Sequence, residues 1–139
     1  MGRPVLVLYL VALGVAAGCS SPDGNLEDLA SRIEPRLSSI QRNVFDVYCA
    51  QPGCHVGFAS ESLLNLESGN AYENLVDVPS VQIPDLRRVA PFRADDSYLI
   101  RKLEANEIVG EAMPRTDIRL PQKAIDVIRQ WIDNGAPPD

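Results

Sequence analysis

The sequence is poor in the residues on which most site chemistry depends. Its 139 residues include one His, one Trp, two Met and three Cys. With a single His, a site for several metals or a zinc site built from His and Cys would lack ligands. Thirteen Lys and Arg stand against nineteen Asp and Glu, which gives a net charge of −6 without a basic stripe. Nucleic-acid binding is disfavoured, because phosphate contacts require clustered cations.

The N-terminus carries the one long apolar run of the chain. Arg3 supplies a positive charge, and residues 5–17 are mostly Val, Leu and Ala. The run is too short to span a bilayer comfortably and is typical of the hydrophobic region of a signal peptide. It ends at Ala16-Ala17-Gly18-Cys19, which resembles a bacterial lipobox, in which the Cys is lipidated and becomes the new N-terminus. An ordinary cleaved signal, with Cys19 a bystander, is the alternative.

This motif sets the expected location and domain plan. We expect residues 1–18 to be a lipoprotein signal peptide, 19–34 the lipidated Cys19 and a tether, and 35–139 the folded domain. The protein would be exported and lipid-anchored to a membrane facing the periplasm. The outer membrane is favoured over the inner, because Ser20 and Ser21 follow the Cys and no Asp lies beside it. Only Cys49 and Cys54 then remain for chemistry, in a compartment where disulfides are permitted.

The sequence predicts that the mature chain is mostly α-helical. Apolar residues at helical spacing predict helices over 35–49, 71–76, from Asp95 or Asp96 to 103, and 121–134. Strand signals are weak, because Pro79 and Pro84 interrupt the short alternating runs. Long loops with little regular structure are expected between Val56 and the third helix, and over residues 105–120. Loops of that length are unusual in a small domain, and a bound prosthetic group would explain how they are ordered.

The most informative motif is Cys49-Ala50-Gln51-Pro52-Gly53-Cys54-His55 at the end of the first predicted helix. The common attachment motif for haem c is C-x-x-C-H, in which two thiols bond to the haem and the adjacent His binds its iron. Here the spacing is C-x4-C-H, and Pro52-Gly53 can turn the longer loop back. A Cys49–Cys54 disulfide is the main alternative, and a zinc site a remote one. A disulfide gives no reason for the only His to follow the second Cys, and a zinc site would need further ligands, with no second His to supply one.

Several further motifs follow the Cys-Cys-His motif along the chain: Leu64-Asn65-Leu66, Arg88-Val89-Ala90-Pro91, Ser97-Tyr98-Leu99, Met113-Pro114-Arg115 and Trp131-Ile132-Asp133-Asn134-Gly135-Ala136. With that motif, they resemble the planctomycete-type cytochrome c domain and its relatives in exported bacterial lipoproteins. The resemblance covers about residues 35–136. The sequence departs from the family in the Cys spacing and in Ala90-Pro91-Phe92-Arg93, which replaces a Pro-Gly turn.

The resemblance implies a class I cytochrome c fold of about three to five helices, with long loops wrapped around one haem. Cys49 and Cys54 would hold one covalent haem c, and His55 would be the proximal iron ligand. Met113 is the predicted sixth ligand, because it is the only Met besides the initiator and lies in the loop before the last helix. Packing of Met113 in the core is the alternative.

Other residues carry weaker expectations. Trp131, Tyr98 and Leu99 would line the haem or pack in the core. Arg87, Arg88 or Arg93 could neutralise haem propionates or simply be solvated. A group of acids is expected to form a solvated face that could steer a basic redox partner: Asp95, Asp96, Glu104, Glu107 and Glu111.

Together these features predict single-electron transfer by a membrane-tethered mono-haem cytochrome outside the cytoplasmic membrane. Its partners would be redox proteins and the membrane that holds its lipid. We expect an electron carrier and not an enzyme, because the only His is already used by the iron. The alternative is a non-enzymatic envelope lipoprotein, stapled by a disulfide and free of haem.

Overall fold

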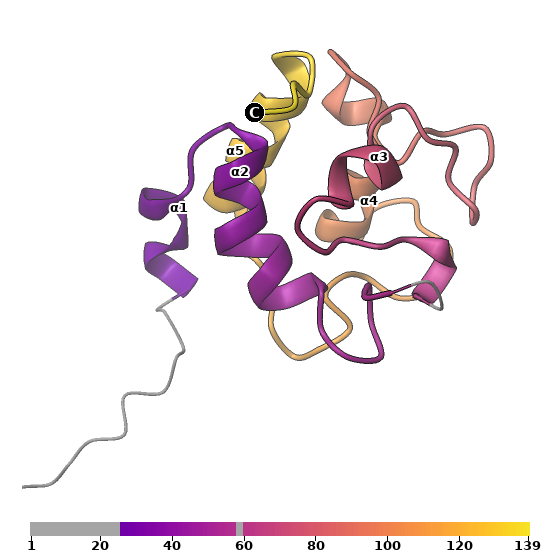
Figure 1. Ribbon diagram of the computed structural model, residues 1–139, viewed down its shortest axis with the longest axis horizontal. Coiled ribbons are helices and arrows are strands. Elements are labelled where there is room, and N and C mark those ends of the chain that lie inside the picture. The colour runs from indigo at the N-terminus through magenta and orange to yellow at the C-terminus, as the bar shows by residue number, and fades with distance from the viewer. Residues whose placement is uncertain (1–25, 58–59) are drawn as a thin grey trace, which may run out of the picture.

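The computed structural model describes residues 26–57 and 60–139 (Figure 1). Over these residues the chain is mostly helical, as predicted, and no named strand occurs among them. The α-helices are α1 (Leu29–Arg32), α2 (Leu37–Ile40), α3 (Ala71–Leu75), α4 (Tyr98–Glu104) and α5 (Gln122–Asp133). A π-helix, η2 (Gln41–Cys49), continues α2, and 3-10 turns form η1 (Leu26–Asp28), η3 (Glu61–Leu63) and η4 (Ala94–Asp96).

Within the described ranges, no helix is both long and apolar enough to cross a membrane. The predicted signal peptide and the lipidation site at Cys19 lie outside those ranges. Pairing between extended segments is limited there to three isolated bridges, which join Val76 to Val89, Pro79 to Arg87, and Arg87 to Ser97. Single backbone hydrogen bonds, such as those from the Asp77 amide to the Val89 carbonyl at 2.9 Å and from the Ser80 amide to the Leu86 carbonyl at 2.8 Å, also order the segment after α3.

The first predicted helix forms, with a change of type partway along. It begins at Leu37, two residues later than Pro35, and widens from α to π at Gln41. The π turn shows in the bond from the Ala50 amide to the Phe45 carbonyl five residues back, at 2.7 Å. The buried Gln41 side chain donates to Asp46 Oδ1 at 2.6 Å and to the Leu66 carbonyl at 2.8 Å. The helix that leads to Cys49 is thereby tied to the loop after His55.

The folded domain begins before residue 35, which corrects the predicted tether. Leu29 is fully buried and Ile33 nearly so, and both belong to the main apolar core. Helix α1 packs against α5 (Figure 1). The polar appearance of residues 20–29 hid this, because two apolar side chains four residues apart are too few to mark a helix by periodicity.

The core is built around one face of α5. Its buried side chains recur at the spacing of a helical face, and they pack with α1, α2, η2 and α4: Ala124, Ile125, Ile128, Trp131 and Ile132. The Trp131 indole is fully buried and donates its N–H to the Pro137 carbonyl at 3.1 Å. Trp131 therefore packs in the helical core, one of the two places expected for it. Helix α5 runs one residue inside each predicted end.

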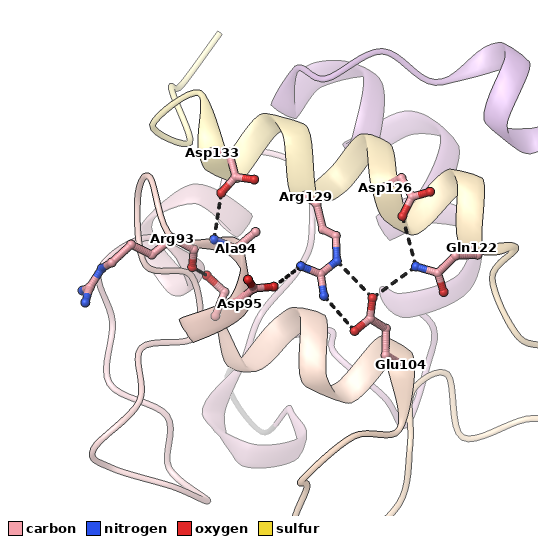
Figure 2. Close-up of polar contacts among 9 residues, drawn as sticks. Arg93, Ala94, Asp95, Glu104, Gln122, Asp126, Arg129 and Asp133 are labelled. Carbon is pink, nitrogen blue, oxygen red and sulfur yellow. Dashed lines mark hydrogen bonds and ion pairs between the residues drawn. The ribbon is translucent and has the colours of Figure 1, made fainter.

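On its outer side, α5 is joined to α4 and η4 by charged groups (Figure 2). Arg129 pairs with Glu104 through two bonds, at 3.0 and 2.8 Å, and with Asp95 at 2.5 Å. Asp133 accepts the Ala94 amide at 2.9 Å. Hydrogen bonds from Arg129 lower the pKa of Glu104 and raise that of Arg129, so the pair stays ionised.

The acidic residues expected to form a solvated face are paired with arginines. Besides Asp95 and Glu104, the pairs are Asp96 with Arg93, Glu107 with Arg101, and Glu111 with Arg115. Neighbouring positive charges offset their field, which weakens the expectation that they steer a basic partner.

The third predicted helix begins later than expected. Asp95 and Asp96, its predicted start, lie within η4, and Ser97 is the N-cap residue of α4.

The turn at residues 90–93 has an unusual backbone. Phe92 follows Pro91 with φ of 65°, the left-handed region that glycine favours. Its amide donates to the Ile132 carbonyl at 2.8 Å, which holds the turn against the end of α5. The Phe92 ring covers Gly135 so closely that a Cβ there would lie 2.6 Å from Cζ. Phe92 thus adopts, without being glycine, the backbone conformation that glycine usually supplies after proline in a turn.

Candidate functional site

The Cys-Cys-His motif forms a closed loop at the end of η2. The His55 amide donates to the Cys49 carbonyl at 3.2 Å, and the Cys54 amide donates to the Gln51 carbonyl at 2.9 Å. Gly53 adopts φ of 81° within the Pro52-Gly53 turn. The longer spacing therefore folds back on itself, as the sequence predicted, and brings His55 beside the end of the helix.

The two thiols have different surroundings and are not joined to each other. Cys49 packs against the apolar core, whereas Cys54 is exposed. Burial, and then the nearby charge of Cys54, raise the pKa of Cys49 to about 12. Cys49 therefore remains a thiol at neutral pH. The loop leaves one sulfur facing the interior and the other at the surface.

His55 is buried and has a defined orientation. Its Nδ1 lies 3.2 Å from the Leu64 carbonyl, which can only accept, so this nitrogen carries the proton. The Leu66 amide donates back to the His55 carbonyl at 2.9 Å. Burial lowers the pKa of His55 and favours the neutral ring. In this tautomer the other nitrogen, Nε2, carries the lone pair through which a histidine binds a metal.

The turn that presents Leu64 is held by a buried cation. Arg88 is 8% exposed, and its guanidinium donates to the carbonyls of Asn74, Ser62 and Leu63 at 2.8, 2.8 and 3.3 Å. The three arginines that could neutralise haem propionates all have partners within the protein. Arg87 pairs with Asp77, and Arg93 pairs with Asp96.

Met113 lies in a loop anchored by a second buried cation. Its amide donates to the Lys102 carbonyl at 2.8 Å, and the Lys102 ammonium donates to the carbonyls of Val109 and Glu111 at 3.0 and 2.6 Å. Tyr98 ties the same loop by accepting the Val109 amide at 3.1 Å. Burial lowers the pKa of Lys102. Met113 itself is half-buried, so it is not a core residue in the ordinary sense.

The His55 loop and the Met113 loop meet at one end of the domain, away from the C-terminus (Figure 1). Arg115, two residues after Met113, lies 3.9 Å from Glu61 and also bonds Glu111 at 2.7 Å. The structure therefore brings together the loops that carry the two predicted iron ligands. The role of Met113 as sixth ligand stays a prediction.

The donor set suits a prosthetic group that brings ligands of its own. Among the described residues, no three His, Cys, Asp or Glu side chains gather as they would around a bare metal ion. One oriented His with two nearby thiols fits an iron porphyrin, which supplies four nitrogens and asks the protein for axial ligands and attachment. Cys49, Cys54 and His55 are the residues that would hold such a group.

No protein-family model matches the chain, and neither a curated protein nor a solved structure matches it. The function proposed below therefore depends on the motif and on the geometry around His55. Sequence reasoning gave Leu64 and Lys102 no part in positioning the site, although Leu64 lies in one of the motifs of the resemblance. The Leu64 contribution is a backbone carbonyl, and no side-chain pattern reports that.

Proposed function

We propose that this protein is a mono-haem c-type cytochrome that transfers single electrons outside the cytoplasmic membrane, where a lipid on Cys19 tethers it. The observation that carries the proposal is the engaged Nδ1 of His55, next to a Cys pair in the order of a haem attachment motif. A disulfide-stapled loop would have no need of a buried histidine whose ring is fixed by a carbonyl.

Each residue of the loop has a distinct task in this proposal. Haem c, when bound, supplies an iron that changes between ferrous and ferric states. His55 offers Nε2 as the proximal ligand, because the Leu64 carbonyl fixes its proton on Nδ1. Cys49, which packs against the core, and Cys54, which is exposed, would form the two thioether bonds that hold the haem. The exposed Cys54 edge is then the natural place for a redox partner to approach.

Met113 completes the proposed ligand set. A thioether opposite a histidine stabilises ferrous iron and raises the potential. The carbonyl of Lys102 holds the Met113 amide, and Arg115 holds the following segment near Glu61. The first contact fixes the Met113 backbone, and the second joins the following segment to the loop after His55; both support Met113 as the sixth ligand.

The decisive experiment is to express the full chain in an exporting host that attaches haem c, and to weigh the denatured mature protein. We expect one haem in the mass and colour that resists acid–acetone extraction. Cys49→Ser and Cys54→Ser should each leave a single bond, and the double variant should lose covalent haem. A haem-free protein with a Cys49–Cys54 disulfide from such a host would overturn the proposal in favour of the stapled lipoprotein.

Two further variants test the rest of the assignment. Met113→Ala should remove the weak near-infrared sulfur-to-iron band of the oxidised protein and lower its potential, whereas Ile118→Ala in the same loop should change neither. Cys19→Ser should move the protein from the membrane fraction to the soluble one. Unchanged spectra in the first variant, or unchanged fractionation in the second, would remove that residue from the scheme.

A further inference from the structure

Arg88 is a buried cation whose side-chain bonds all go to the backbone. Its three acceptors are carbonyls from two separate parts of the chain: Asn74 at the end of α3, and Ser62 and Leu63 in η3. A cation taken out of water is costly unless its hydrogen bonds are replaced. Its presence here therefore points to a task that a smaller or neutral side chain would not perform.

The backbone from which Arg88 projects is itself fixed. The Arg88 amide donates to the Val78 carbonyl at 2.7 Å, and its carbonyl accepts the Leu99 amide at 2.9 Å. The residues on either side, Arg87 and Val89, both form bridges to other segments. The backbone that carries the guanidinium is thus held in place. The planar guanidinium has several N–H donors, so it can bind several carbonyls in one fixed geometry.

The segment that Arg88 holds is strained. Ser62 and Leu63 have φ of 57° and 53°, so two successive residues other than glycine occupy the left-handed region. This conformation is unfavourable for residues with a side chain, and it persists only where the surroundings enforce it. Arg88 bonds the carbonyls of both residues. The next residue is Leu64, whose carbonyl meets His55 Nδ1 at 3.2 Å.

We propose that Arg88 is a positioning residue for His55: by clamping the left-handed turn at Ser62 and Leu63, it places the Leu64 carbonyl so that the ring proton is held on Nδ1 and Nε2 is free to bind. The inference deepens the proposed function, and it rests on that function only for the identity of what Nε2 binds. The clamp and the proton position are properties of this chain with or without haem.

Three variants separate positioning from general stability. Arg88→Met keeps the length and removes the fork, and Arg88→Lys keeps the charge with a single ammonium. Arg87→Met is the matched control, because Arg87 is the adjacent arginine but is exposed and bonds Asp77 instead. Each would be made in the full chain and purified after export, with its histidine labelled with nitrogen-15.

The readout is the His55 ring, seen by nitrogen-15 NMR well below the unfolding transition. The wild type and Arg87→Met should show a single Nδ1–H form whose proton exchanges slowly. In Arg88→Met, that proton should exchange about tenfold faster, as expected for the loss of one hydrogen bond. Arg88→Lys should fall between them. If Arg88→Met does not fold, the exchange rates of the Nδ1 proton in Arg88→Lys and Arg87→Met are compared instead.

The outcomes distinguish this inference from the proposed function. A folded Arg88→Met or Arg88→Lys protein with the wild-type exchange rate and nitrogen shifts would overturn the positioning role, whether or not haem is bound. A haem-free wild type whose ring proton still depends on Arg88 would support positioning and count against the cytochrome. With haem bound, the reduction potential should also shift in Arg88→Met and stay constant in Arg87→Met.

Discussion

Around α5 the buried side chains are nearly all apolar, whereas the loops that carry His55 and Met113 enclose two cations, Arg88 and Lys102. The contrast follows from the backbone. A helix satisfies its own amides and carbonyls, so its buried face can be plain hydrocarbon. A loop leaves carbonyls without partners, and one buried cation can satisfy several of them. Irregular segments can therefore be as well defined as helices, by a chemistry that depends on single residues.

The largest expected effect lies in the helical region. Ile128 is fully buried in α5, so Ile128→Ala should lower the free energy of unfolding by about 3 kcal/mol, through lost burial and the cavity left behind. Val81→Ala is the control, because Val81 is 55% exposed and should change stability by less than about 0.5 kcal/mol. Denaturant unfolding measures both. Equal small losses would show that the apolar face of α5 does not carry the stability of the fold.

In the loop region, Lys102→Met should act locally. It keeps the apolar stem but leaves the carbonyls of Val109 and Glu111 without their donor, at a cost of about 1–2 kcal/mol. Hydrogen exchange at the Met113 amide and proteolysis within residues 105–115 should both accelerate. Lys123→Met, an exposed change on α5, should alter neither rate. A loop that stays protected in Lys102→Met would mean that the cation is not what orders it.

A smaller effect is expected where the two regions join, at Glu104 and Arg129. Because Arg129 lowers the pKa of Glu104 in the folded state, the unfolded chain takes up a proton first as pH falls. The pair thus contributes its full stability, about 1 kcal/mol, above the unfolded pKa near 4.3, and loses it as pH falls through the lowered folded value. Glu104→Gln should remove that part of the pH dependence of unfolding, and Glu73→Gln should leave it. A wild-type slope in Glu104→Gln would contradict the assignment.

The smallest expected effect is a coupling at the turn next to α5. Gly135 has φ of 97°, so Gly135→Ala is strained by the backbone alone, at about 1 kcal/mol. The new methyl would also meet the Phe92 ring. In a Phe92→Ala background that second penalty should vanish, which a double-mutant cycle would show as about 0.5 kcal/mol of coupling. Strict additivity would show that the ring moves aside freely.

Helix α5 was predictable nearly to the residue, because its apolar positions recur at helical spacing and Asn134-Gly135 ends it. The π-helix was not, since its widening accompanies the bond from Gln41 to Leu66, far along the chain. Such a contact leaves no local mark in the sequence. The sequence likewise places Leu29 and Ile33 in a tether, because their burial depends on packing against distant parts of the chain.

The residues of the candidate site also differ in whether the sequence alone reveals them. Cys49, Cys54 and His55 stand out in the sequence, because their identities and spacing are themselves the chemistry. Arg88 and Lys102 look like ordinary surface cations, because what they bind is backbone, whose carbonyls every loop residue carries. Only the folded positions of Ser62 and Glu111 show which cations are internal.

The burial of Leu29 and Ile33 also limits where the protein can work. Under the proposed lipidation, the chain between Cys19 and Leu26 can reach at most about 25 Å when fully extended. A domain of this size is itself roughly 35 Å across. The domain would then remain within about one domain diameter of the lipid surface and could not reach a partner held farther away. Electron exchange would be confined to proteins that share that membrane or come to it.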